Sequence, residues 1–579
     1  MERSSYTPLH LDPIDSCSHQ VPKIQQYIGH RAASSSEYQN MPSRTILIVG
    51  AGPVGLTMAL SLHRSGVPPQ DILVVDQKPA HDPSRKWSKA ISMSASTLEI
   101  FRILGIAERF VKIGRPLHTQ HFGGGLQLLH LNYDVIGTKY PFNMGLLQTR
   151  TEAILLQRCE ELGIEVIWGR RLISLSQTES AVSARIKNTD TPEGTADGMV
   201  ETIEASWLIG CDSTHSAVRE AAGIPFEGTA TTRYSWLADG FCDENTPAML
   251  TVRGKDGKSL IIASGDGPTG RRFIGNAPMA VNPGGERPKA PSESEVREWA
   301  AKEFGSHYNF HNMTWSSVVG NAMQVAGTFR SGRVFLAGDA ARQLYPSGGL
   351  GMNTGLVDAT NLAWKLAAVV TGEVGPDKGV VERVLDSYTT ERLASSKAVV
   401  QNVRMQMQVL FEYTEDEKAV SAFITEALAE PALQKRWAQR MTGFGDPVEP
   451  YQQPSGRGTA DSLVGTRLTH IADDNDPALL EATLKGRFIL AAVGGSGSEA
   501  NEYEKFKDLA NTDRYAGRVS VLAAPLTALD EKWRQVNAVL IRPDLRVAWV
   551  ARDGTDVEAS EAELARTLQW WLGNRTGKL

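Results

Sequence analysis

The stretch TILIVGAGPVGLTMALSLHRSGVPPQDILVVDQKP, residues 45–79, decides the fold of this chain. It begins with a short apolar run rich in β-branched residues, as a buried parallel strand requires, and then enters a glycine-rich loop at 50–55. A helical pattern follows that Gly66 is placed to end, and a second apolar run ends at Asp76. The order of strand, glycine loop, helix, strand and acid predicts one βαβ unit of an α/β fold.

The loop at 50–55 has the spacing GxGxxG, which fits a dinucleotide. Gly50 allows the tight turn, Gly52 lets the backbone approach a pyrophosphate, and Gly55 brings the helix against the strand. The helix N-terminus supplies N–H groups and a favourable dipole for phosphates. Asp76 can accept hydrogen bonds from the adenosine ribose, and an acid at this place disfavours the 2'-phosphate of NADP. The unit alone does not separate FAD from NAD.

A second glycine-rich stretch, GDAARQLYPSGGLGMNTG at residues 338–355, follows the apolar run VFLAG and precedes another helical pattern. FAD is long, so a βαβ unit that holds its adenosine end needs a later segment for the ribityl chain and the ring. Asp339 suits the ribityl hydroxyls. The backbone of SGGLGMN, at a helix N-terminus, suits the flavin edge that becomes anionic on reduction.

This second loop resembles the GDAAH-x-x-x-P-x-G-G-x-G-M-N signature of class A flavoprotein monooxygenases. That family includes para-hydroxybenzoate hydroxylase, phenol 2-monooxygenase and tetracycline-type oxygenases. The segment WLIGCDSTHSAVREAAGI, residues 207–224, is similar to the family's GADGxxSxVR, with Asp212, Ser216 and Arg219 at the matching places. The resemblance therefore implies that the second loop approaches the isoalloxazine ring.

A further segment, LLQTRTEAILLQRCEELGIEV at residues 146–166, is similar to a helix of the family in which a glutamine touches the flavin cofactor. Gln148 stands at that place. With the loop at 50–55, four motifs follow one another in the family's order over residues 45–395.

Three positions depart from the family pattern. The usual histidine after GDAA is Arg342, the glycine after the middle aspartate is Ser213, and an expected arginine is Lys89 in SKAISMSASTLEIFRILGI. A lysine keeps the positive charge but loses the bidentate fork of arginine. None of the three changes removes a flavin ligand outright, and we expect them to affect ring motion and reductant docking.

The motifs and the resemblance imply FAD as the cofactor, with NADPH or NADH as a transient reductant that binds without a Rossmann loop of its own. Tyr234 and Arg233, in TTRYSWLAD, are candidates for contact with a substrate phenol, and a surface or core role in a sheet is the alternative. No residue is identified as a catalytic base, and no metal site is expected. The predicted cofactor-binding residues are Gly50, Gly52, Pro53, Val54, Gly55, Asp76, Gln77, Lys89, Gln148, Asp212, Asp339, Pro346, Gly348, Gly349, Gly351, Met352 and Asn353.

The rest of the chain divides by composition and pattern. Short alternating runs separated by Gly, Pro, Asp and Asn predict an inserted mixed or antiparallel sheet, which in the family is the substrate domain. A Pro- and Gly-rich stretch near residue 450 predicts a boundary. We expect a flexible N-terminal extension at 1–43, a Rossmann-like FAD-binding domain at 44–225 and 331–450, the sheet domain at 226–330, and a C-terminal α/β domain at 451–579.

The C-terminal domain resembles the thioredoxin-like domain of the phenol hydroxylase branch. It lacks CxxC, and the chain has no cysteine after Cys242, which excludes a thiol redox role. Trp570 and Trp571, near the end of its last helical pattern, are expected to be packing residues rather than part of a binding site.

The resemblance implies a monooxygenase that consumes NAD(P)H and O2 and hydroxylates a phenolic or polyketide-like aromatic substrate through a flavin C4a-hydroperoxide, in secondary metabolism. One alternative is the same flavin chemistry applied to Baeyer–Villiger oxidation or oxidative rearrangement of a polyketide. Another is a non-catalytic flavin- or ligand-binding protein. The sequence leaves the identity of the substrate and the choice between NADPH and NADH open.

Composition indicates the general class of protein, its compartment and its partners. Apolar residues make up 41% and charged residues 22%, as in ordinary globular proteins, and a net charge of −6 gives no support to nucleic-acid binding. Four widely spaced cysteines indicate a reducing compartment. The N-terminus has no apolar signal region, and no apolar run approaches the roughly 18 residues of a membrane span. We expect a cytoplasmic protein whose partners are a small substrate and O2, with a homodimer left open.

Overall fold

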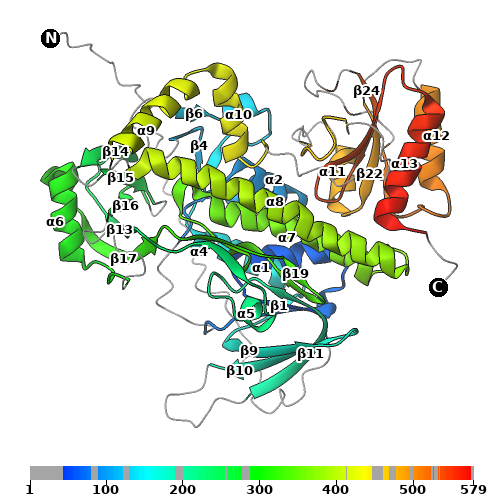
Figure 1. The fold of residues 1–579 in the computed structure, drawn as a ribbon, viewed down its shortest axis with the longest axis horizontal. Helices are drawn as coiled ribbons and strands as arrows, with labels where there is room; N and C mark the ends of the chain where they lie inside the picture. Colours follow the sequence, from blue (N-terminus) through cyan, green and yellow to red (C-terminus); the bar gives the residue numbers. More distant parts are fainter. Residues whose placement is uncertain are drawn as a thin grey trace.

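The computed structural model of the protein has a mixed α/β fold (Figure 1). The predicted N-terminal extension at 1–43 lies outside the described residues. These are 44–79, 89–121, 130–189, 200–254, 257–264, 267–276, 287–411, 414–445, 461–468, 477–493, 500–522, 526, 533 and 535–574.

An eight-stranded sheet contains the βαβ unit predicted from residues 45–79. The path of its strands is β19-β20-β11-β1-β2-β8, and the hairpin of β9 and β10 extends it from β11. Five strands pair in parallel: β20 (Val334–Leu336), β11 (Val200–Gly210), β1 (Arg44–Val49), β2 (Ile72–Val75) and β8 (Glu165–Ile167). The antiparallel strands are β19 (Arg330–Ser331), β9 (Arg170–Gln177) and β10 (Val182–Asn188). All four residues of β2 are buried, as its apolar run predicts.

Helices on the sheet carry the predicted loops at their N-termini. α1 (Pro53–Arg64) begins with a proline, which suits the first helical turn, and ends just before Gly66, whose φ is 100°. It contacts α4 (Gln148–Glu161) and α7 (Leu350–Val370). α7 is almost entirely buried because α8 (Lys378–Phe411) runs along its other side (Figure 1).

Residues 234–320 contain the antiparallel sheet that the alternating runs predict. Its strand order is β14 (Met249–Gly254), β15 (Gly257–Ala263), β16 (Gly270–Asn276), β13 (Tyr234–Phe241) and β17 (His311–Gly320). Helix α6 (Glu293–Phe304) closes an aromatic core on one face of this sheet. Strands β12 (Phe226–Thr229) and β18 (Met323–Ala326) instead join β21 (Arg342–Gln343), which lies within the second glycine-rich stretch.

Shorter elements complete this part of the chain. They are α2 (Ala95–Ile103), α3 (Ala107–Val111), α5 (Ala217–Ala221), α9 (Glu415–Leu428), α10 (Pro431–Met441) and strands β3 (Ser92–Met93), β4 (Arg115–Leu117), β5 (Thr119–His121), β6 (His130–Asn132) and β7 (Asn143–Gly145). No helix among the described residues is long and apolar enough to cross a membrane.

The described part of residues 461–574, here called the C-terminal unit, has its own four-stranded sheet. The order is β23 (Val519–Val521), β22 (Phe488–Ala492), β24 (Val536–Ile541) and β25 (Val547–Arg552), with helices α11 (Pro477–Leu484), α12 (Ala500–Asn511) and α13 (Val557–Leu572). Trp571 is fully buried and Trp570 packs beside it, which confirms their predicted packing role.

Candidate active site

Three of the predicted motifs, together with Asp76, follow the carboxyl ends of adjacent parallel strands. Val49, the last residue of β1, pairs with Val75 of β2 on one side and with Gly210 of β11 on the other, and Gly210 pairs with Leu336 of β20. The first glycine loop, Asp76, Asp212 and Asp339 follow these strand ends in the chain. In open α/β sheets ligands bind outside this edge of the sheet, so segments far apart in sequence face one region.

The first glycine loop is packed tightly at two glycines and open at the third. A Cβ atom at Gly50, whose φ is 112°, would lie 2.3 Å from the carbonyl oxygen of Cys211. A Cβ atom at Gly55 would lie 1.8 Å from the carbonyl oxygen of Gly50. At Gly52, which precedes α1, an added Cβ atom would have no neighbouring group within 4 Å. The loop therefore leaves room for a ligand at the backbone of Gly52.

Asp76 closes the same loop from β2. Its carboxylate accepts hydrogen bonds from the backbone N–H of Ala51, at 2.7 Å, and of Lys78, at 2.8 Å. An ionised carboxylate has about four acceptor positions, so capacity remains for ribose hydroxyls. Gln77 is exposed, and its carbonyl accepts a hydrogen bond of 2.9 Å from the Thr189 hydroxyl.

Asp339 follows β20 and faces the first turn of α7. Among the described residues none donates a hydrogen bond to its carboxylate. A Cβ atom at Gly351 would lie 3.9 Å from its Oδ1. Burial raises the pKa of Asp339, and the positive charges of Lys89 and Arg342 offset this in part. This carboxylate is half-buried, and hydroxyl groups of a ligand could donate the hydrogen bonds that the described residues do not.

The loop before α7 depends on two glycines in the left-handed region. Gly348 has φ 73° and Gly349 has φ 66°. The Asn353 side chain braces the loop: its Nδ2 donates to the carbonyl of Gly349, at 2.7 Å. Its Oδ1 accepts from the backbone N–H of Ser94, at 2.8 Å, and from the Thr97 hydroxyl, at 2.7 Å. Asn353 thus shapes the loop through its side chain and leaves backbone groups to face a ligand.

The neighbouring predicted residues differ in exposure. Pro346 is exposed, and Met352 is half-buried against the main core. Pro53 is buried, and Val54, half-buried, packs against Gly338 and Gly355.

Gln148, at the start of α4, is hydrogen-bonded to the segment that contains Lys89. The Gln148 Oε1 accepts from the backbone N–H of Ala90, at 3.0 Å, and its backbone N–H donates to the Ala90 carbonyl, at 2.9 Å. The carbonyl of Lys89 accepts a hydrogen bond of 2.7 Å from Arg272 of β16. Arg272 also forms a buried ion pair with Asp239 of β13, so the antiparallel sheet holds this segment. Sequence reasoning did not identify this pair.

Asp212 has a structural role in addition to its predicted one. It accepts a hydrogen bond of 2.6 Å from Ser216, and another from a backbone N–H of α5. Burial raises its pKa. Ser213 has φ 72°, which gives the physical reason for a glycine at this place in the family pattern. Arg219 donates to the carbonyl of Ala340, at 3.0 Å, and ties α5 to the second loop.

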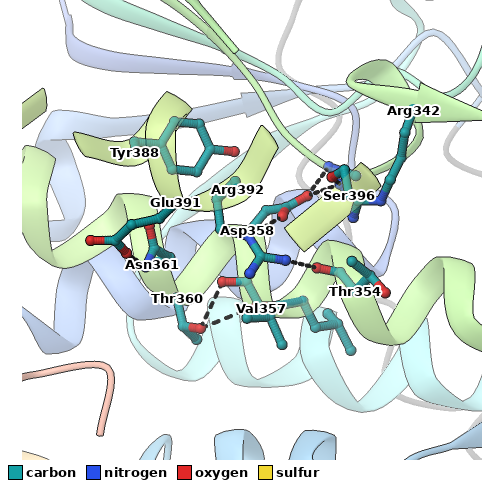
Figure 2. Close-up of polar contacts among 12 residues, drawn as sticks. Arg342, Thr354, Val357, Asp358, Thr360, Asn361, Tyr388, Glu391, Arg392 and Ser396 are labelled. Atoms are coloured by element: carbon teal, nitrogen blue, oxygen red, sulfur yellow. Dashed lines mark hydrogen bonds and ion pairs between the residues drawn. The ribbon is translucent and has the colours of Figure 1, made fainter. Parts of the chain in front are cut away.

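Arg342, which replaces the family's histidine, is buried in an ionic cluster (Figure 2). Its Nη1 donates to Asp358 of α7 at 2.7 Å, and the same carboxylate accepts from the backbone N–H of Gly338, at 3.0 Å. The second oxygen of Asp358 accepts from the Nε of Arg392, at 2.7 Å. The sequence signal for Asp358 was an acid within a largely apolar helical pattern, and sequence reasoning missed it.

The two substrate candidates lie at the start of β13. Arg233 forms an ion pair with Glu417 of α9, at 3.0 Å. Tyr234 is half-buried and pairs with Gly320 of β17. A nearby contact links sheet and loop directly, because the Tyr345 hydroxyl donates to Ser235 at 2.8 Å. A role of Arg233 and Tyr234 in substrate binding stays a prediction.

An apolar cluster lies between the antiparallel sheet, α8, α10 and the second glycine-rich stretch. Its buried members are Leu131, Tyr133, Ile136, Leu260, Met323, Tyr345, Leu350, Val400, Val403, Met407, Val409, Leu410, Leu428, Ala438 and Met441. Tyr345 and Leu350 flank Pro346 and the two left-handed glycines, so this cluster adjoins the predicted flavin loop.

Comparisons with known proteins agree with this geometry. Residues 43–403 match the FAD binding domain family, and residues 461–574 match the aromatic-ring hydroxylase C-terminal family. An uncharacterized aromatic compound monooxygenase of Bacillus subtilis is 30% identical, over 91% of this chain and 97% of its own length. A rifampicin monooxygenase of Streptomyces venezuelae is 28% identical, over 92% and 99%. The solved structure of an anhydrotetracycline hydroxylase from Streptomyces rimosus covers 92% of this chain and 100% of its own, with a TM-score of 0.72 and 26% identity.

The glycine loops at the strand ends and the family matches together define a flavin-dependent oxidoreductase. The chain belongs to the class A FAD-dependent monooxygenases, with the C-terminal domain of the aromatic-ring hydroxylases. FAD is its cofactor, and NAD(P)H as reductant is typical of the family. The family inferred from the four motifs is thereby confirmed.

Proposed function

We propose that this monooxygenase hydroxylates a phenolic or polyketide-like aromatic substrate in secondary metabolism, with NADPH or NADH as the transient reductant. The observation that supports the site is the free space at Gly52 together with the half-buried carboxylate of Asp339, to which no described residue donates a hydrogen bond, both at one edge of one sheet. The rifampicin and anhydrotetracycline enzymes support the substrate class, since each is named for a large polycyclic or aromatic compound.

The residues present fit FAD along this edge. Asp76 would bind the adenosine ribose, and the backbone at Gly52 with the N-terminus of α1 would bind the pyrophosphate. Asp339 would accept hydrogen bonds from the ribityl chain. The backbone at Gly348 and Gly349 would lie against the ring edge, where the helix dipole of α7 favours negative charge.

Bound FAD supplies the acceptance of a hydride from NAD(P)H and the activation of O2. The overall balance is substrate, NAD(P)H, O2 and a proton giving hydroxylated substrate, NAD(P)+ and water. The chain's own tasks are to orient the substrate, to exclude water and to favour an electron-rich phenolate or enolate. The apolar cluster beside Tyr345 and Leu350 suits the exclusion of water, and the Tyr345–Ser235 hydrogen bond fixes the sheet against the loop.

We further propose the finer division of the fold. The parallel order of β20, β11, β1, β2 and β8 supports a Rossmann-like FAD-binding domain, and the four-stranded sheet with α11, α12 and α13 supports a thioredoxin-like domain. The proposed boundaries are 44–225 and 331–450 for the first domain, 226–330 for the substrate domain and 451–579 for the last.

The two alternatives are less favoured. Baeyer–Villiger oxidation or rearrangement would use the same site, and a non-catalytic flavin-binding role would need no substrate. The relatives reported above are named as two monooxygenases and a hydroxylase, which favours an oxygen-transferring enzyme over a non-catalytic role, and the name of the hydroxylase supports hydroxylation.

The decisive experiment follows flavin absorbance without oxygen. We expect NADPH or NADH to bleach the yellow holoenzyme slowly alone and much faster with one class of phenol or polyketide acid, and O2 then to give a hydroxylated product. If neither nucleotide bleaches the flavin with any compound, the hydroxylase proposal is wrong.

The site itself is tested by Gly52→Ala. Because the added methyl group meets free space in the protein, the apoprotein should unfold at an unchanged temperature, while FAD affinity falls by about tenfold or more. Equal FAD affinity in the variant and the wild type would contradict the placement of the pyrophosphate.

A further inference from the structure

A buried ionic cluster joins the C-terminal unit to the two long helices. We call its members, Asn361 and Lys365 of α7, Glu391 of α8, and Arg542 and Asp544 after β24, the interface cluster. Arg542 donates from both terminal nitrogens to Glu391, at 2.8 and 2.9 Å, and also pairs with Asp544 at 2.6 Å. The Nδ2 of Asn361 donates to Glu391 at 2.7 Å and to Asp544 at 2.9 Å. Lys365 lies 3.1 Å from Glu391.

The same two helices carry the cluster that holds the second glycine loop. Glu391 and Arg392 are consecutive on α8, and Asp358 and Asn361 lie one turn apart on α7 (Figure 2). Arg392 pairs with Asp358, and Asp358 holds the backbone N–H of Gly338, directly before Asp339. The two clusters are therefore linked through the backbones of α7 and α8, and the hydrogen bond from Gly338 to Asp358 connects the second cluster to the segment of the predicted ribityl-binding residue.

Burial makes this arrangement demanding. The side chains of Arg542 and Glu391 are 2% and 1% exposed, and that of Asp358 is fully buried. Buried ion pairs add little net stability compared with apolar packing, but they tolerate only geometries in which every charge keeps its partners. Such contacts fix one relative position of α7 and α8, which is the property that the loop between β20 and α7 needs.

We propose that Arg542 is a positioning residue for the flavin site: through Glu391 the C-terminal unit fixes α8 against α7, and through Asp358 this holds Gly338 and Asp339 in place. The inference rests on the proposed role of the second loop in binding FAD. It assigns to the C-terminal unit a role in cofactor binding that requires no thiol.

The test compares three variants of the full chain, freed of FAD and titrated with FAD while flavin fluorescence is followed. Arg542→Met removes the contact to Glu391, and Arg542→Lys keeps the charge without the two-pronged geometry. Arg552→Met is the matched control, since Arg552 pairs with Asp461 inside the C-terminal unit. We expect the FAD Kd to rise about tenfold in Arg542→Met and less in Arg542→Lys, and to stay within about twofold of the wild type in Arg552→Met.

Hydrogen exchange of the holoenzymes provides a second readout. In Arg542→Lys we expect faster exchange of backbone amides at 337–343, a segment that Arg542 does not touch, and unchanged exchange there in Arg552→Met. If Arg542→Met does not fold, the Lys variant decides. An FAD Kd and loop exchange equal to those of the wild type in the folded Arg542 variants would overturn the positioning role alone. A wild-type chain that fails to bind FAD would overturn the proposed site together with it.

Discussion

Ser213 adopts a left-handed backbone conformation, with φ 72°, directly after Asp212, whose carboxylate accepts a hydrogen bond from a backbone N–H of α5. Its side chain is exposed, so no packing depends on it. A side chain costs about 1–2 kcal/mol in this region, which glycine avoids. The strain lies at the end of β11, beside the first glycine loop, and a single substitution can remove it.

We therefore expect Ser213→Gly to raise the free energy of unfolding by about 1 kcal/mol, because the relief of strain exceeds the cost of the greater unfolded-state entropy that glycine brings. Chemical denaturation of the apoprotein measures this change. Ser294→Gly, at an exposed position in α6, is the control, and it should lower stability by up to about 1 kcal/mol. Destabilisation by Ser213→Gly would contradict the strain.

The carboxyl group of Asp339 lies in an environment that disfavours its charged form. Because burial raises the pKa of this carboxyl, the folded apoprotein holds the proton more tightly than the unfolded chain. Its contribution to stability is complete below the unfolded pKa and is lost as pH rises through the folded pKa. Asp339→Asn should therefore stabilise the apoprotein at neutral pH and flatten this dependence, while weakening FAD binding.

Urea unfolding of both apoproteins between pH 4 and 8 would check the prediction, and the difference between them removes the contribution of other buried acids. Parallel curves of stability against pH for the variant and the wild type would show that folding does not change the pKa of Asp339.

At the scale of elements, the N-terminus of α7 combines two kinds of glycine. Gly349, at the N-cap, has a left-handed backbone, and a Cβ atom there would lie 2.9 Å from the Ser92 hydroxyl. Gly351 lies inside the helix, and its Cβ would have no atom closer than 3.9 Å. The first glycine serves the shape of the loop, whereas the second leaves space at the helix face that we assign to the flavin.

Alanine at these two positions should accordingly have opposite effects on the apoprotein. Gly349→Ala should destabilise it by about 1–2 kcal/mol, and Gly351→Ala should stabilise it by up to about 1 kcal/mol through helix propensity. Both should weaken FAD binding, Gly351→Ala because its methyl group enters the proposed cofactor space. Melting temperatures of the apoproteins and FAD titrations separate the two effects. Unimpaired FAD binding by Gly351→Ala would contradict the proposed position of the flavin at this helix face.

At the scale of the molecule, one apolar core includes the C-terminal unit and the ends of α7 and α8. Trp364 of α7 contacts Phe488 and Trp571, with ring centroids 5.5 and 5.2 Å apart. Arg64, at the end of α1, also donates to the carbonyl of Pro543 across the same boundary, at 3.1 Å. The helices that begin at the two glycine loops therefore end against the C-terminal unit (Figure 1).

From this shared core we expect Trp364→Ala to destabilise the protein by about 3–5 kcal/mol. The Trp364 side chain lies on α7 and packs against the C-terminal unit. Calorimetry of the holoenzyme should therefore show one unfolding transition that moves as a whole to lower temperature. Two separate transitions, only one of them shifted, would show that the parts unfold independently.

The sequence by itself determined the βαβ unit, the antiparallel sheet and the order of the four motifs, because strand runs, glycines and turn residues act over short distances. Residues 45–79 fold as their local pattern predicts, with Gly66 after the end of α1. The family match follows from the same local signals, because motif glycines such as Gly50 and Gly55 are required by the close packing of the backbone.

Only the tertiary structure decided which residues act together. Asp358, Arg392, Glu391 and Arg542 come from separate segments, and their pairing depends on how α7, α8 and the C-terminal unit pack. The partners of Arg233 and Asn353 could likewise not be predicted from the sequence, since Glu417 and Ser94 lie far from them along the chain. A buried charge must find its partner in space, and the distance along the chain carries no information about that partner.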